Sequence, residues 1–332
     1  MNKPSVSFII PYYKVELALL ERAVESVRRL EQYADWDIWI IDDGTPGTAA
    51  QEYAEALKDT RIHYHKQPNN GPGGARNTGM RLAQKEYIHF LDADDYLFFT
   101  PTRQAIQLLQ QQKPDLLGFQ FRKVFNKTLT DLPTSDPKIR FSGNGIDFML
   151  HHNMYGSVWS YFFRKSIAED IRFTPIAYHE DEEFTAFLFL KAKTLLITAL
   201  PVYAYYQRRG SIMHDQECQS VKKQFLDLIH ILTNMKSKVR ELPSPAAQAL
   251  NRRTNLMCMS MVYTLLGDSP DSHFLLDMLR RMKQAGLYPL APHAYTLPYI
   301  IIRMLSSTPA AMVIVSKFFR MLHFRHAGPS VE

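Results

Sequence analysis

Acidic side chains follow two apolar segments in the first third of the chain. Asp92 and Asp94 come directly after the run that ends at Leu91, and Asp43 follows Ile38–Ile41. Carboxylates at positions i and i+2 of an extended segment point the same way. Two such ligands suit Mg²⁺ or Mn²⁺, with phosphate oxygens completing the shell, so Asp92 and Asp94 are candidate metal ligands. The alternative is a solvated acidic turn, because D-x-D is a short motif.

Four further features contain residue types that can bind a ligand or move a proton. The carboxylate of Asp43 can accept a hydrogen bond from a nucleobase or a ribose; otherwise it belongs to a turn. Arg76 follows the glycine-rich segment Asn69–Gly74 and could pair with a diphosphate at a helix N-terminus, unless the segment is a flexible loop. Glu180–Glu183 could contain a general base, because like charges raise a carboxyl pKa, or could be a charged helix N-terminus. His214 is a candidate metal ligand or a structural histidine.

Alternating strands and helices must position these side chains. Compact apolar runs and helical spacing predict strands at 6–10, 38–41, 61–64, 87–91 and 116–121, with helices at 17–30, 48–58, 75–84 and from Pro101. Strands separated by helices predict a parallel, doubly wound sheet, which binds ligands at the carboxyl ends of its strands. Thr48 with Gln51 predicts a capping box. The polar segment 126–145 predicts a surface loop.

Composition and charge narrow the function classes. The 332 residues carry a net charge of +6, but residues 216–332 alone hold 14 Lys and Arg against 7 Asp and Glu. A nucleic-acid-binding protein is basic more uniformly, so no nucleic-acid partner is expected. Cys218 and Cys258 cannot build a disulfide-rich scaffold and predict reduced core residues in a cytoplasmic protein. No uninterrupted apolar run approaches the roughly 20 residues of a spanning helix, and residues 6–10 are too short for a signal peptide.

Five motifs, taken in order, resemble the family-2 glycosyltransferases of the GT-A fold. The family's motifs V-S-I-I-I-P-x-Y-N, D-D-G-S, A-R-N-x-G, F-L-D-A-D-D and a later E-D are matched by Val6–Lys14, Asp42–Thr45, Ala75–Gly79, Phe90–Asp95 and Glu180-Asp181. The resemblance covers roughly residues 4–214. It implies an α/β fold with a Rossmann-like mixed sheet flanked by helices. It also implies a catalytic domain at 1–215, with a nucleotide-sugar half at about 1–125 and an acceptor half at about 126–215, before a mainly helical region at 216–332.

The resemblance implies an inverting transfer of a hexosyl or N-acetylhexosaminyl group from a nucleotide-sugar, usually a UDP-sugar. The acceptor would be a saccharide or a lipid-linked saccharide in bacterial cell-surface polysaccharide synthesis, and the cofactor would be Mn²⁺ or Mg²⁺. On the donor side, Pro11 and Tyr13 would line the nucleotide pocket, Asp43 would bind the uracil and Arg76 would contact the donor. Asp92 would lie near the ribose and the metal.

The remaining roles that the resemblance implies concern the metal and the acceptor. Asp94 would ligate the metal, with His214 as a second candidate, and Asp181 would be the general base, with Glu180 as the alternative. Trp159 and Glu180 would lie on the acceptor side, although Trp159 could equally be a core residue. Lys14 replaces the family's usual Asn, which affects donor details only.

Other interpretations stay open at this point. A nicotinamide-dependent oxidoreductase would use a doubly wound sheet, but no G-x-G-x-x-G follows the first strand. A non-catalytic nucleotide- or carbohydrate-binding protein would share the binding residues. The interleaved apolar and basic residues of 299–325 suit peripheral contact with the inner face of the plasma membrane, packing on the catalytic domain or a homodimer.

Overall fold

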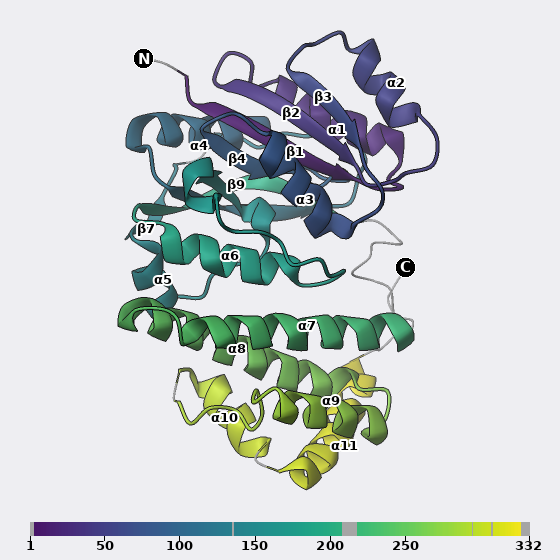
Figure 1. Ribbon diagram of the computed structural model, residues 1–332, viewed down its shortest axis with the longest axis vertical. Helices are drawn as coiled ribbons and strands as arrows, with labels where there is room; N and C mark the ends of the chain where they lie inside the picture. Colours follow the sequence, from purple (N-terminus) through teal and green to yellow (C-terminus); the bar gives the residue numbers. More distant parts are fainter. Residues whose placement is uncertain (1–2, 135, 208–217, 294, 307, 327–332) are drawn as a thin grey trace. The chain divides into compact units, whose positions relative to one another are not determined.

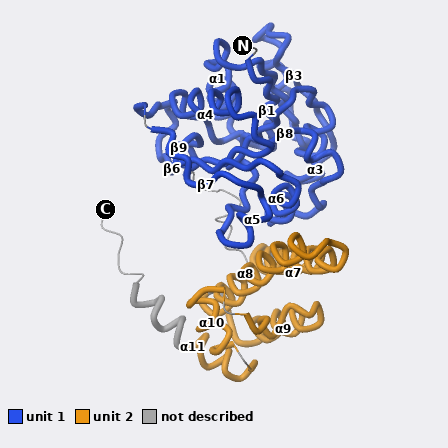
Figure 2. Tube along the Cα trace, turned by 90° about the vertical axis from the view of Figure 1, so that its left-hand side faces the viewer, with its two compact units in different colours: residues 1–214 blue, residues 215–332 orange. Residues whose placement is uncertain are grey.

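The computed structural model describes residues 3–134, 136–207, 218–293, 295–306 and 308–326. The chain divides into two compact units, residues 1–214 and residues 215–332, which Figure 2 shows in different colours. Every predicted site residue that the structure describes belongs to the first unit. His214 lies outside the described residues.

A mixed sheet forms the centre of the first unit (Figure 1). Its strands are β1 (Ser5–Tyr12), β2 (Asp35–Asp42), β3 (Ile62–Lys66), β4 (Tyr87–Phe90), β5 (Tyr96–Leu97), β6 (Leu116–Val124), β7 (Ile139–Gly143), β8 (Tyr161–Arg164) and β9 (Leu195–Tyr206). Their order is β3-β2-β1-β4-β8-β6-β9-β5, and β7 pairs with β9. The strands β3, β2, β1 and β4 are parallel, as predicted. The expectation of a parallel sheet fails at β8, which is antiparallel to β4 and β6 because the chain enters β8 from the edge at which those strands end.

Helices cover both faces of this sheet. They are α1 (Leu17–Arg28), α2 (Ala49–Ala56), α3 (Gly71–Leu82), α4 (Phe99–Gln112), α5 (Gly145–His151) and α6 (Glu180–Lys191). Successive side chains of a strand point to opposite faces, so Phe8 of β1 packs in one core with Val24 of α1, while Ile9 faces α3. A Cβ atom at Gly79 of α3 would lie 2.3 Å from Cγ2 of Ile9. The glycine therefore allows α3 to lie directly on β1.

Three local predictions differ from the structure. Helix α3 begins at Gly71 within the glycine-rich segment, because Pro72 has a fixed φ that suits a first helical turn. The expected loop at 126–145 contains β7, an edge strand whose exposure explains its polar sequence. The capping box is wrong, because the hydroxyl of Thr48 donates to Glu52 Oε1 at 2.6 Å instead of capping the helix.

The second unit is built from helices, as predicted. They are α7 (Cys218–Val239), α8 (Ser244–Asp268), α9 (Ser272–Gln284), α10 (Leu297–Leu305) and α11 (Pro309–His326). Cys258 of α8 is a buried free thiol. Among the described residues, no single helix has the length and apolar composition needed to cross a bilayer. Helix α10 and the segment Pro309–Lys317 meet that criterion only as a pair, bent by 108°.

Candidate active site

The carboxyl ends of three neighbouring parallel strands bring the predicted donor residues to one edge of the sheet. Pro11, near the end of β1, pairs with Ile41 of β2, and Asp43 follows β2 directly. Strand β4 pairs with β1 on the other side and leads to Asp92. The sequence motifs of residues 6–14, 42–45 and 90–95 therefore meet because of strand register.

Arg76 joins the turn after β4 to the start of α6. Its Nη2 donates to Asp92 Oδ1 at 3.0 Å, and its Nη1 donates to Glu180 Oε1 at 2.6 Å. The guanidinium is buried, and so is the carboxylate of Glu180, whereas the Asp92 side chain keeps 29% of its exposure. Residues 76, 92 and 180 thus form one charged network, although the sequence separates them by up to 104 positions.

The glycines before Arg76 let α3 approach the chain itself. A Cβ atom at Gly73 would lie 3.0 Å from Cβ of Phe173 and 3.1 Å from Cγ of Glu180. A side chain at position 73 would therefore push α6 away from α3. The close packing of these two helix starts holds Arg76 within reach of Glu180.

Asp181 follows Glu180 in the first turn of α6 and has a different environment. Burial, together with the negative charges of Glu180 and Glu182, raises the pKa of Asp181 well above its usual range. Burial also raises the pKa values of Asp92 and Glu180, but Arg76 opposes the rise at both through a direct ion pair. Within the described part of the chain, no hydrogen bond holds the Asp181 carboxylate. A carboxylate with a raised pKa and free oxygens is suited to take up a proton.

Asp94 and Asp95 have separate environments although they are adjacent. The half-buried Asp94 accepts a hydrogen bond from Arg22 Nη2 at its backbone carbonyl, at 2.5 Å. Asp95 is buried, and it accepts hydrogen bonds from the Tyr203 hydroxyl at 2.7 Å and the Tyr206 backbone N–H at 2.7 Å. Asp95 therefore fixes the turn, while the side chain of Asp94 lies nearer to solvent.

The carboxylates of this turn suit a divalent cation in their chemistry. The part of the chain that the structure describes contains no group of three or more His, Cys, Asp or Glu side chains that could hold a metal. However, Mg²⁺ and Mn²⁺ accept one or two protein carboxylates when phosphate oxygens and water supply the rest. Burial is the main cause of the raised pKa values of Asp92 and Asp95, and the negative charge of Asp94 raises both further. The carboxylates of this turn therefore repel one another. A cation bound by Asp92 and Asp94 would relieve this repulsion.

The predicted nucleotide-binding residues surround the end of β2. Asp43 is buried, and its Oδ1 accepts hydrogen bonds from Gln67 Nε2 at 2.7 Å and from the Asn70 backbone N–H at 2.9 Å. The ring of Tyr13 is exposed, and the ammonium group of Lys14 lies 4.9 Å from its centre. The loop that precedes α3 therefore holds Asp43 in a fixed orientation.

Trp159 is part of an aromatic stack beside the same turn. Its ring is stacked on Tyr203, with centroids 4.4 Å apart, and on Tyr205 at 5.7 Å, and Phe121 meets it edge-on at 5.1 Å. The hydroxyl of Tyr203 that donates to Asp95 also accepts from the backbone N–H of Asp92 at 3.2 Å. Trp159 is half-buried, so it contributes to packing while keeping part of its surface accessible.

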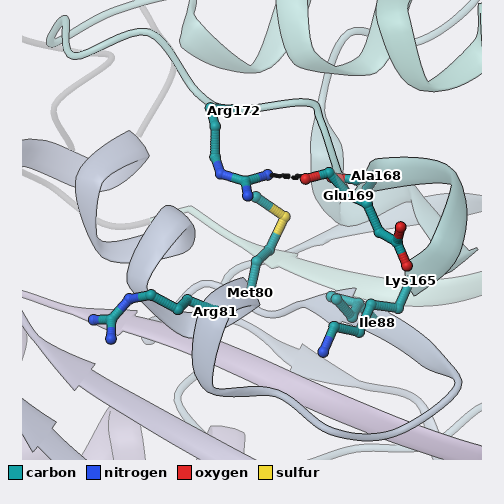
Figure 3. Close-up of a pocket in the computed structure, with 7 residues that line it drawn as sticks. All are labelled: Met80, Arg81, Ile88, Lys165, Ala168, Glu169 and Arg172. Carbon is teal, nitrogen blue, oxygen red and sulfur yellow. Dashed lines mark hydrogen bonds between the residues drawn. The ribbon is translucent and has the colours of Figure 1, made fainter.

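A cavity of about 160 Å³ lies apart from this cluster (Figure 3). None of the predicted site residues lines it; the lining residues are Met80, Arg81, Ile88, Lys165, Ala168, Glu169 and Arg172. Arg172 Nη1 donates to the backbone carbonyls of Ala168 and Glu169, so this guanidinium stabilises the turn beside it. The candidate site is therefore defined by the carboxylates and Arg76.

A family model decides the assignment that the motifs and the geometry suggested. Residues 7–172, half of the chain, match the model of glycosyl transferase family 2. The chain belongs to glycosyl transferase family 2. The matched segment contains Arg76, Asp92 and Asp94, whereas α6 with Asp181 lies beyond it.

Several bacterial proteins are similar to part of the chain. It is 30% identical over 225 residues to the uncharacterized glycosyltransferase EpsJ of Bacillus subtilis, covering 63% of each chain. It is 38% identical over 115 residues to the putative colanic acid biosynthesis glycosyl transferase WcaA of Escherichia coli, covering 34% of this chain and 39% of WcaA. It is 40% identical over 94 residues to the succinoglycan biosynthesis protein ExoW of Rhizobium meliloti, covering 27% of this chain and 29% of ExoW. The chain thus spans less than two thirds of each relative.

Solved structures confirm the fold class. The crystal structure of Staphylococcus aureus TarS 1-349 in complex with UDP-GlcNAc has a TM-score of 0.70 at 16% identity, covering 99% of this chain and 94% of that one. Mannosyltransferase PcManGT of Pyrobaculum calidifontis, in complex with GDP-Man and Mn²⁺, has a TM-score of 0.51 at 15% identity, covering 97% of this chain and 88% of PcManGT. The predicted GT-A mixed sheet flanked by helices, with a helical C-terminal region, is confirmed.

Sequence reasoning missed two residues of this family-2 site. Arg22 of α1 is buried, with its guanidinium 4.7 Å from the ring centres of both Tyr96 and Tyr206, and it connects the Asp94 carbonyl to that of Asn126. Tyr203 connects Asp92 to Asp95 from the distant strand β9. An arginine on the apolar face of the amphipathic helix α1 was a detectable signal for Arg22, whereas nothing local indicated Tyr203.

Proposed function

We propose that this family-2 chain transfers a sugar from a nucleotide-sugar, a UDP-sugar, to an acceptor hydroxyl with inversion at the anomeric carbon. The observation that carries the proposal is the Arg76 network, which joins the acidic turn after β4 to the acidic start of α6. This link between the two acidic segments supports a donor-side acid pair and a proton acceptor that act on one substrate. The UDP-GlcNAc complex of TarS, a protein of the same fold, supports a UDP donor and a hexosyl or N-acetylhexosaminyl group.

The donor would lie along the carboxyl edge of the sheet. Pro11 and Tyr13 would contact the nucleoside, and Asp43 would accept a hydrogen bond from the uracil through Oδ2, since Oδ1 already has two donors. Asp92 would lie near the ribose. Arg76 is already paired with two carboxylates, which supports a role in orienting Asp92 more than a direct contact with the diphosphate.

Asp92 and Asp94 would hold Mn²⁺ or Mg²⁺ together with the diphosphate of the donor. When bound, such an ion stabilises negative charge on the departing diphosphate. The Mn²⁺ in the PcManGT complex supports a divalent cation as the cofactor. His214, the second candidate metal ligand, lies outside the residues that the structure describes.

Asp181 would act as the general base. The acceptor oxygen would attack the anomeric carbon from the side opposite to the diphosphate, the bond to the diphosphate would break, and the acceptor proton would pass to Asp181. A single displacement of this kind inverts the anomeric centre. The ion pair of Glu180 with Arg76 supports Asp181 over Glu180, because a carboxylate fixed by a cation is a weaker base. Trp159 would form a wall for the acceptor saccharide.

The relatives named for colanic acid and succinoglycan biosynthesis support a role in cell-surface polysaccharide synthesis. We place the reaction in the cytoplasm, and the free buried thiol of Cys258 supports a reducing compartment. The acceptor would be a saccharide, free or linked to a lipid. The family match replaces the oxidoreductase interpretation.

The first experiment measures thermal stabilisation by UDP with Mn²⁺. A ligand at a hundredfold excess over its Kd stabilises the folded state by about 2.7 kcal/mol. We expect a metal-dependent shift that Asp94→Ala removes and that Asp170→Ala, at an exposed carboxylate paired with Lys191, leaves unchanged. If none of UDP, GDP and dTDP raises the melting temperature, the donor proposal is contradicted.

The second experiment separates transfer from binding. Asp181→Asn should keep the UDP-dependent shift but lower the rate of UDP release from a UDP-sugar, with acceptor present, by about 10²–10⁴-fold. Asp170→Asn is the matched control. UDP binding without turnover of any donor and acceptor pair would instead favour the non-catalytic interpretation.

A further inference from the structure

Helix α10 presents an apolar face to solvent. Leu297 is 69% exposed, Ile301 is 46% exposed and Met304 is 70% exposed. Their spacing of four and three positions places them on one side of the helix. Tyr299 and Ile302 are buried within the same unit, so α10 uses its other side for packing. A contiguous exposed apolar face of this kind marks a surface for interaction.

The next helix contains a further exposed apolar side chain. Ile314 of α11 is 71% exposed, and α10 packs against α11. Thr308, just before α11, and Pro309, the first residue of α11, are exposed as well. We call Leu297, Ile301, Met304 and Ile314 the α10–α11 apolar residues.

The chain around these residues is basic and contains no acid. Residues 282–331 include no Asp or Glu but five Lys and Arg, namely Lys283, Arg303, Lys317, Arg320 and Arg325. Arg281, just before this segment, is paired with Asp277. Lys317 is exposed one turn after Ile314. A partner that fits this segment must therefore offer an apolar layer next to a dense negative charge.

Charge decides between the candidate partners. In a symmetric dimer the same patch meets itself, so two basic segments without carboxylates would face one another and repel. An anionic bilayer offers both properties, because acyl chains lie directly beneath negatively charged head groups. Each Lys or Arg near such a surface contributes about 1 kcal/mol, which is roughly a fivefold gain in affinity.

We propose that the α10–α11 apolar residues dock on the surface of an anionic lipid bilayer. Leu297, Ile301 and Met304 enter the boundary between head groups and acyl chains, and Lys317 lies at the level of the phosphates. The inference rests on the second unit alone and does not depend on the proposed sugar transfer. Where that transfer takes place on a lipid-linked acceptor, the same contact confines the enzyme to the surface that holds the acceptor.

The test is co-sedimentation of the full chain with vesicles of phosphatidylcholine alone or mixed with phosphatidylglycerol. We expect binding to the mixed vesicles that weakens as salt is added, and weak binding to phosphatidylcholine. Leu297→Ser with Met304→Ser should lower the affinity for mixed vesicles by about tenfold or more, because two apolar side chains no longer enter the bilayer. Lys317→Glu should lower it as well, because it reverses an exposed charge. The matched control is Leu276→Ser on α9, an exposed leucine outside the α10–α11 apolar residues.

Three results would overturn the proposal. In the first, the wild-type chain does not bind to mixed vesicles. In the second, the Leu276→Ser control loses as much affinity for them as the Leu297→Ser, Met304→Ser double variant, and in the third the double variant binds as tightly as wild type. A solution dimer that the double variant abolishes, without vesicle binding, would assign the face to a second copy. Circular dichroism checks that the variants are folded, and UDP-dependent stabilisation without vesicles should be unchanged, which separates this test from that of the sugar-transfer proposal.

Discussion

Replacing Arg76 by Gln tests the network that connects the two acidic segments. The variant keeps a polar side chain of similar length but removes the cation between Asp92 and Glu180. Glu180 is the more buried partner, at 7% side-chain exposure against 29% for Asp92, so it loses most when its counter-charge is removed. Breaking a buried ion pair from one side costs about 3–5 kcal/mol. We therefore expect Arg76→Gln to lower the free energy of unfolding by about that amount at neutral pH.

The pH dependence of this loss follows from the carboxyl groups. Burial already raises the pKa values of Asp92 and Glu180, and Arg76 opposes that rise. Without Arg76 both values rise further above those of the unfolded chain, about 4. The folded variant then binds more protons than the unfolded chain above this pH, so its stability falls as pH rises. The deficit relative to wild type should be largest at neutral pH and should shrink towards pH 4.

Urea unfolding at neutral and at acidic pH measures this deficit. Tryptophan fluorescence reports on the first unit, because Trp36, Trp39 and Trp159 all lie there. Arg28→Gln is the control, since Arg28 pairs with Glu25 on an exposed surface at 3.1 Å and should cost less than about 1 kcal/mol. A deficit for Arg76→Gln no larger than that of the control, or one that does not change with pH, would refute the reasoning.

Three other substitutions test separate parts of the fold. Burial lowers the pKa of His89 from 6.5 to about 4, so between these pH values the unfolded chain binds a proton that the folded chain does not. Wild type should therefore lose about 3 kcal/mol of stability as pH falls from 6.5 to 4, and His89→Phe should lack this loss in urea unfolding. If the variant's stability falls with pH as steeply as that of wild type, other groups cause the loss. Tyr203→Phe removes a hydroxyl that joins Asp92 to Asp95, so it should lower the free energy of unfolding by about 1–3 kcal/mol. It should also weaken UDP binding measured by calorimetry, and an unchanged UDP affinity would mean that Tyr203 does not support the donor site. Gly145→Ala places a Cβ atom 1.9 Å from the Phe189 carbonyl oxygen, so it should lower the Tm although alanine favours helices, and a higher Tm would mean that α5 can move away from α6.

Local patterns predicted most elements of the first 125 residues, because apolar periodicity and turn residues act within a few positions. The strands β1 to β4 were placed to within a few residues. The errors arose where a distant partner decided the outcome. Strand β7 exists because β9 lies beside it, and β8 is antiparallel because of the edge from which it enters.

The site shows the same division between local and distant information. The motifs at 42–45, 75–79 and 90–95 were visible in the sequence because close backbone approach and charge need particular residue types at short spacing. The sequence could not place Arg76 between Asp92 and Glu180, and it could not distinguish Glu180 from its neighbour Asp181.

By itself, the sequence determined the family, the parallel start of the sheet and the residue types available for chemistry. Only the tertiary structure decided which carboxylate is paired and which is fixed by Tyr203. It also decided that Asp181 has a raised pKa and, among the residues that the structure describes, no hydrogen bond to its carboxylate. The physical reason is that a carboxyl group takes its charge state from burial and from nearby charges in space. Neighbours such as Arg76 and Glu180 are brought together by folding and not by their separation along the chain.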